Sequence, residues 1–91
     1  MSGPATAQGD FRLSDLRSGE TGVVLRLEVD GDQRRRLMDL GLIPGTEVTA
    51  ELVSPLGDPV AYRVRGSLIA LRRDQARLIV IRREADREDE E

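Results

Sequence analysis

One stretch in the middle of the chain, QRRRLMDLGLIPGT (residues 33–46), decides the fold. Its first eight residues are good helix formers that follow two aspartates able to cap a helix, so they predict one short helix. Gly41 stands where a left-handed residue ends a helix, and Leu42 is then expected to fold back onto Leu37 in a Schellman motif. We expect Leu40 to join these two leucines on the buried edge of the helix.

Strand patterns lie on both sides of this helix. The tetrapeptide Ile-Pro-Gly-Thr at 43–46 is typical of a type II turn, because proline fixes φ at the second position and glycine allows a positive φ at the third. Apolar runs and apolar–polar alternation predict five strands, over residues 21–29, 46–53, 60–64, 68–71 and 78–81. Turn residues separate them, above all in the loop PLGDP at 55–59.

The alternation also assigns a buried face to each strand. In the first strand it predicts that Val23, Leu25 and Leu27 point toward the core. In the second strand Leu52 is expected on the buried side. Tyr62 alternates with arginines in the third strand, so its ring is expected to point inward.

These elements predict a mainly β protein, a small closed β-barrel of about five strands with one short helix. A chain of 91 residues has room for one domain. We expect the folded unit over residues 11–83, after a small, polar and disordered leader at 1–10. Residues 84–91 hold six acids and one arginine and are expected to form a disordered acidic tail.

The composition excludes several kinds of chemistry. The chain has no cysteine and no histidine, and all 14 basic residues are arginine. It therefore has no thiol nucleophile, no imidazole base or metal ligand, and no lysine for a Walker-type phosphate loop. No apolar run approaches the length of a membrane span, and residues 1–10 do not resemble a secretory signal, so a cytoplasmic protein without catalytic residues is expected.

Motifs spread over residues 13–82 resemble the FeoA family, the ferrous iron transport A proteins. The more specific ones are RLxDLGLxPG at 36–45 and PxGDP at 55–59, and they are accompanied by LxxLxxG at 13–19, VxG at 64–66 and IALR at 69–72. The resemblance implies an SH3-like β-barrel. It also implies a non-enzymatic accessory role in bacterial iron uptake, through protein–protein contact with FeoB, the membrane Fe(II) permease that carries a cytosolic G domain.

Six residues are candidates for that contact. Arginine is favoured at interfaces for its planar donors and weak hydration, and apolar residues near loops often mark a docking surface. The arginines come from the helix and from what is expected to be the outward face of one strand, and the leucines lie near loops; the set is Arg34, Arg35, Leu42, Leu56, Arg63 and Arg65.

Other interpretations remain open from the sequence. The same arginines can form a solvated surface, or the barrel can bind nucleic acid, although the chain has few aromatic residues for stacking. The FeoA domain also occurs in metal-dependent repressors, which suggests a metal-responsive regulatory module. Members of the family are described as binding transition metal ions, but this chain offers only oxygen donors such as Asp39, Glu47 and Asp58, and we expect no metal site and no cofactor.

Overall fold

The computed structural model describes residues 11–83. The expectations for residues 1–10 and 84–91 lie outside the described residues. Within 11–83, no helix combines the length and the apolar character that crossing a bilayer requires.

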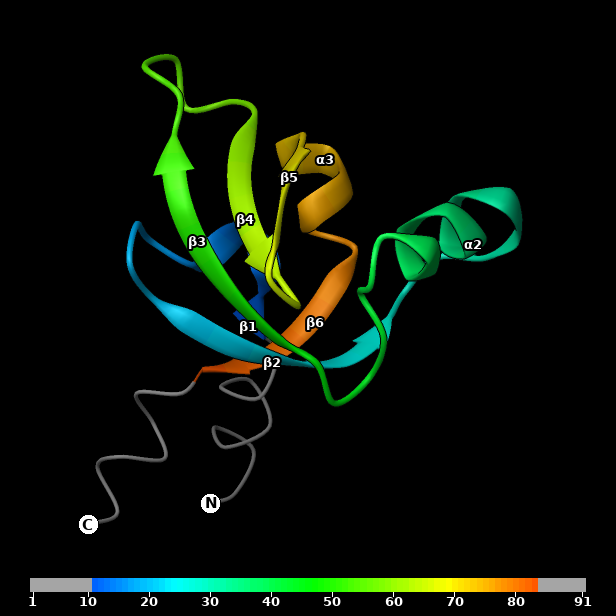
Figure 1. The fold of residues 1–91 in the computed structure, drawn as a ribbon. Helices are drawn as coiled ribbons and strands as arrows, with labels where there is room; N and C mark the ends of the chain where they lie inside the picture. The colour runs from blue at the N-terminus through cyan, green and yellow to red at the C-terminus, as the bar shows by residue number, and fades with distance from the viewer. Residues whose placement is uncertain (1–10, 84–91) are drawn as a thin grey trace, which may run out of the picture.

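One antiparallel sheet forms the body of the protein, with strand order β1-β6-β2-β3-β4-β5. Figure 1 shows the strands curling around a common core, with helix α2 standing to one side. In chain order the elements are β1 (Phe11–Arg12), the 3-10 helix η1 (Leu13–Asp15), β2 (Thr21–Leu27), α2 (Gly31–Asp39), β3 (Glu47–Val53), β4 (Val60–Val64), β5 (Ser67–Leu71), α3 (Arg73–Ala76) and β6 (Ile79–Arg83).

The five expected strands and the helix are confirmed. The expected closure of the barrel is not, because within 11–83 the end strands β1 and β5 of the curled sheet do not pair with each other. The two-residue strand β1 and the single-turn helix α3 are additions that the sequence pattern did not predict.

The core is aliphatic, apart from Tyr62. The phenol ring is buried on β4 as expected, and its Oη donates a hydrogen bond to the carbonyl oxygen of Leu13 at 3.4 Å. Burial raises the pKa of the Tyr62 phenol to about 12. The other buried residues are supplied by every strand except β1 and by all three helices; the largest are Leu13, Leu37, Leu42, Leu71, Ile79 and Ile81.

A register shift in β2 changes which side chains face the core. The pairing of β2 with β6 is irregular between Val24 and Arg26. A bulge of this kind reverses the alternation on one strand. Val24 is therefore buried, and the prediction that Val23 and Leu25 face the core is wrong, whereas Leu27 beyond the shift is buried as expected.

A second register shift lies in β3, where the pairing with β4 is irregular between Ala50 and Leu52. Val48 and Ala50 before the shift are fully buried. The side chain of Leu52 after it is 67% exposed, so the expected burial of Leu52 is wrong. The same bulge leaves Leu52 on the solvent side of the sheet, opposite Ala61.

The C-terminal end of α2 forms the expected Schellman motif. The amide of Leu42 donates to the carbonyl of Leu37 at 3.2 Å, and the amide of Gly41 donates to that of Met38 at 2.9 Å. Gly41 has a φ of 102°, and both Leu37 and Leu42 are fully buried. The expectation for Leu40 is wrong, because at the C-cap its side chain turns toward solvent.

The type II turn after the helix is consistent with the structure. The amide of Thr46 donates to the carbonyl of Ile43 at 3.0 Å, and Gly45 has a φ of 95°. This turn brings the chain from α2 directly into β3, so the position of the helix beside the sheet is fixed by local backbone geometry.

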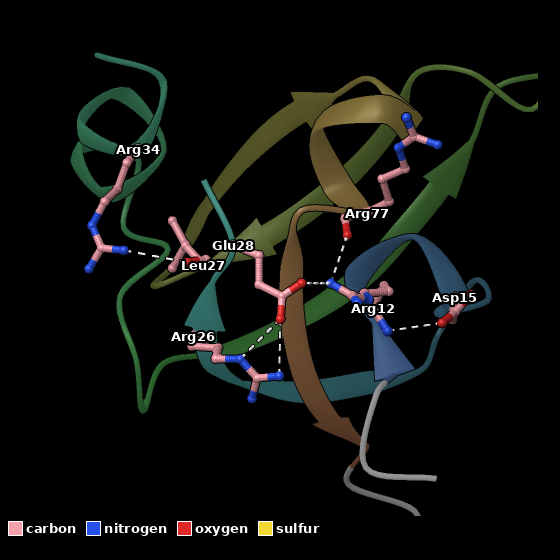
Figure 2. A network of polar contacts seen from close by, with 7 residues as sticks. All are labelled: Arg12, Asp15, Arg26, Leu27, Glu28, Arg34 and Arg77. Atoms are coloured by element: carbon pink, nitrogen blue, oxygen red, sulfur yellow. Dashed lines mark hydrogen bonds and ion pairs between the residues drawn. The ribbon is translucent and has the colours of Figure 1, made fainter. Parts of the chain in front are cut away.

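A polar network ties β1 to its neighbours (Figure 2). Nη1 of Arg12 donates to Oε1 of Glu28 at 2.7 Å and to the carbonyl of Arg77 at 3.4 Å. Oε2 of Glu28 accepts two bonds from the guanidinium of Arg26. The hydrogen bonds from Arg12 and then Arg26 hold the pKa of the Glu28 carboxyl below its ordinary value. The amide of Arg12 donates to Asp15, so the short strand is anchored at both its backbone and its side chain.

Candidate functional site

Apart from Tyr62, no polar or charged residue within 11–83 is buried, and no group of three or more acidic side chains there is placed to hold a metal ion. The features that could engage another molecule therefore lie on the surface of the described domain.

Arg34 and Arg35 are neighbours on α2 but differ in exposure. Nη1 of Arg34 donates to the carbonyl of Leu27 at the end of β2 (3.4 Å), so this side chain is half-buried, whereas Arg35 is exposed. Both border a shallow cavity of about 440 Å³ that Met38, Asp39 and Gly31 also line. The helix thus presents a small recess in which an apolar thioether is flanked by cationic groups.

Arg63 and Arg65 do not share the strand face that the alternation predicted. Arg63 lies on the outer face of β4, and its Nε donates to Oε2 of Glu51 at 2.9 Å. Arg65 lies beyond the end of β4, in the turn to β5, with a φ of 53°. The Arg65 side chain lies beside Gly41, where a Cβ would stand 3.4 Å from the Arg65 Cδ. Arg65 therefore belongs to the surface near the end of α2.

The two candidate leucines differ sharply in exposure. Leu56, at the tip of the loop between β3 and β4, is 93% exposed. Leu42 is 0% exposed, because the Schellman motif that closes α2 folds its side chain into the core. The prediction that Leu42 contributes to a docking surface is wrong, and its role is to anchor the helix to the sheet.

The sequence interpretation missed an apolar surface on the outer face of β3, β4 and β5. Directly paired residues of antiparallel strands point to the same face, and the register pairs Leu52 with Ala61 and Ala61 with Ala70. In the neighbouring row Arg63 pairs with Leu68, which is 52% exposed. An apolar stripe therefore crosses three strands on the solvent side, with one ion-paired arginine beside it.

This surface ends at β5, the last strand of the sheet. Among residues 11–83, the only strand that pairs with β5 is β4. At the C-terminal end of β5, Ala70 borders a shallow cavity of about 440 Å³ whose other walls are Asp58, Pro59, Arg72 and Gln75. The outer face and the free edge thus meet beside a recess.

Gly66 is a signal in the sequence that could have revealed the exposed residues of β5, because it marks a tight turn. The turn between β4 and β5 has two residues, Arg65 and Gly66, and both have a positive φ. Such a turn fixes the hairpin register. Arg63, which faces out, is then opposite Leu68, so Leu68 faces out as well. The bulge that exposes Leu52 has no comparable local signature.

Comparison with known proteins gives consistent matches. The family model described as the FeoA domain matches residues 11–83. A Fe(2+) transport protein A/Fe(2+) transporter FeoB fusion protein of Porphyromonas gingivalis is 37% identical over 71 residues, which are 78% of this chain and 8% of that protein. This chain thus spans a small part of the length of that relative.

Two solved structures share the architecture. The FeoA protein of Chlorobium tepidum superposes with a TM-score of 0.76 at 35% identity, covering 81% of this chain and 70% of that one. FeoA of Stenotrophomonas maltophilia, solved in complex with zinc and described as an SH3 domain protein, gives a TM-score of 0.70 at 29% identity, covering 78% and 88%. The expected SH3-like fold is confirmed by these matches together with the curled six-stranded sheet.

Proposed function

Because the chain belongs to the FeoA family, a family of ferrous iron transport, we propose that it is a non-enzymatic accessory protein that acts by contact with a FeoB-type Fe(2+) transporter. The contact is made on the cytosolic side, with the G domain of the transporter as the receiving part. The iron ion is the cargo of the transporter and is not handled by this chain.

The fusion protein of Porphyromonas gingivalis is the observation that carries this proposal. In that relative a segment similar to this chain is joined covalently to a transporter named FeoB. Covalent linkage raises the effective concentration of two domains for one another to the millimolar range for short linkers. Fusion of this kind is expected for domains that act by binding to each other. It supports the transporter as the partner of this chain.

The surface of the described domain is suited to binding a protein. Leu56 is almost fully exposed, and the outer face of β3, β4 and β5 carries an apolar stripe. Exposed apolar groups beside arginines are enriched at protein interfaces. We place the contact on these features and on the exposed side of α2, with Arg34, Arg35, Leu56, Arg63 and Arg65 as contributing residues.

The described residues do not fit a transition-metal site. Their possible ligands are carboxylates, and no three of these gather within 11–83. First-row transition metals in proteins commonly use imidazole or thiolate ligands, which this chain does not contain. No metal-dependent step is part of the proposal.

Affinity capture tests the proposal. The FeoB-type transporter of the same organism, solubilised in detergent, is expected to retain the wild-type protein. Arg35→Glu should weaken retention by about tenfold, because it reverses a charge at the edge of the α2 recess. Arg36→Glu makes the same charge change at an exposed position of the same helix that does not line the recess, and should bind like the wild type. A transporter that fails to retain the wild-type protein would contradict the proposal.

A further inference from the structure

We propose that the free edge of β5 binds an extended segment of the partner, which adds to the sheet as a further strand and carries acidic residues at its ends. The identity of the partner rests on the proposed function, whereas the mode of binding rests on the backbone and charges of this edge. Addition of a strand to an exposed sheet edge is a general mode of peptide recognition, in which main-chain hydrogen bonds supply affinity.

The hairpin geometry shows which backbone groups of β5 face the free edge. Residues that flank a two-residue hairpin turn form a hydrogen-bonded pair, and bonded and non-bonded pairs alternate from there. With Val64 opposite Ser67, the bonded pairs are those that include Ser67, Ile69 and Leu71. The N–H and C=O groups of Leu68 and Ala70 therefore point away from β4.

The bonds on the opposite side of the hairpin agree with this assignment. The amide of Ala50 donates to Glu20, so the backbone groups of Ala50 point toward β2. Those of Thr49, one residue earlier, then point toward β4, where Thr49 pairs with Arg63. The backbone N–H and C=O of Arg63 therefore bond to β3. Arg63 and Leu68, which lie opposite each other, are then a non-hydrogen-bonded pair of β4 and β5.

The edge lacks three of the usual protections against strand addition. Sheet edges are commonly shielded by charged residues, proline or bulges, or are covered by a helix or loop. β5 has five residues, Ser-Leu-Ile-Ala-Leu, with no charge and no proline, and its pairing with β4 has no register shift. Beside Ala70, the recess bordered by Pro59 and Gln75 has room for a side chain of an added strand.

The charges at the two ends of this edge indicate the chemistry of the added segment. Arg65 lies before β5, and Arg72 and Arg73 follow it. Two acids lie near the C-terminal end of the edge: Asp58, whose Oδ1 accepts the amide of Arg73 at 2.9 Å, and Asp74 in α3. An added strand with acidic residues at its ends would be attracted at both ends of the edge.

The same charges disfavour a second copy of this chain as the occupant. Two β5 strands paired antiparallel about Ile69 would bring the end of one copy that carries Arg65 next to the end of the other that carries Arg72 and Arg73. The like charges gathered at both ends would repel one another. The edge is therefore matched to a different polypeptide, and in the proposed function this is a segment of the transporter.

Binding of the detergent-solubilised transporter to two variants of one position tests this mode. Ala70→Pro removes an N–H that points outward without removing a bond to β4, a place where edge strands tolerate proline. We expect its affinity to fall by about tenfold or more, since a main-chain bond is lost and the ring blocks the edge. Ala70→Ser keeps the N–H at a similar size and should bind like the wild type.

Leu68→Lys is the second variant. A lysine on an edge strand disfavours the addition of a further strand, and it leaves the backbone of β5 unchanged. It should weaken binding even if Ala70→Pro does not fold, as judged by circular dichroism and thermal unfolding. If both folded variants bind like the wild type, the edge is not the binding site, although the proposed function stands. If the wild-type protein itself does not bind, the proposed function fails. Wild-type dimers that Leu68→Lys dissociates would make a second copy the occupant and overturn the inference.

Discussion

The two end strands of the sheet, β1 and β5, have differently protected edges. β1 has two residues, the Arg12 amide donates to Asp15, and the Arg12 guanidinium is bound by Glu28. β5 has five uncharged residues and pairs, within 11–83, with β4 alone. Since proteins shield the edges that must not pair, the contrast indicates that β1 closes the fold and that β5 is kept available for a partner.

Truncation of one leucine near each edge should give the largest difference. Leu13 follows β1 and is fully buried, whereas Leu68 on β5 is half-exposed. Leu13→Ala leaves a cavity and should lower the free energy of unfolding by about 2–5 kcal/mol. Leu68→Ala should change it by no more than about 0.5 kcal/mol. Urea denaturation of the two variants measures both values, and equal losses would remove the distinction between the edges.

Tyr62→Phe should have an intermediate effect on the closed side. The Tyr62 hydroxyl donates to the carbonyl of Leu13 directly after β1, in the buried core. Its removal leaves that carbonyl without this donor and should cost about 0.5–1.5 kcal/mol in the free energy of unfolding. The measurement is chemical denaturation beside the wild type. A variant as stable as the wild type would mean that this bond does not help to close the β1 side.

Glu28→Gln should give the smallest effect, and the effect should depend on pH. The pKa of Glu28 is lowered in the folded protein from 4.5, its ordinary value, by Arg12 and Arg26. The ionised group therefore stabilises the fold above that ordinary value, and the contribution is lost as the pH falls through the lower folded pKa. Thermal midpoints of wild type and variant should differ at neutral pH and converge in acid. A difference that persists unchanged in acid would assign the effect to something other than this ionisation.

Local sequence signals predicted the parts of the fold that local geometry determines. The Schellman motif needs only a glycine at 41 and its immediate neighbours, and the turn at 43–46 needs only a proline and a glycine at its two central positions. The inward position of Tyr62 followed from strict alternation in β4, where the pairing is regular on the β5 side. Each of these features lies within a few residues of the signal that predicted it.

The parts that could not be predicted depend on pairing between distant segments. Whether β2 and β3 contain bulges depends on their pairing with β6 and β4. No residue in either strand indicates from the sequence where the extra, unpaired residue lies. Leu25 and Leu52 were therefore assigned to the wrong face. The candidate site was affected as well, because Leu52 was expected on the buried side and is 67% exposed on the outer face of the sheet.

Hydrogen exchange at residue resolution, on the protein alone and bound to the detergent-solubilised transporter, tests the central claim most directly. In the free protein the amides of Leu68 and Ala70 should exchange rapidly, and the amide of Ile69, directed toward β4, slowly. Binding should slow exchange at Leu68 and Ala70 and leave the Arg12 amide, already bonded to Asp15, unchanged. Unchanged exchange along β5 in a complex that has formed would contradict the account.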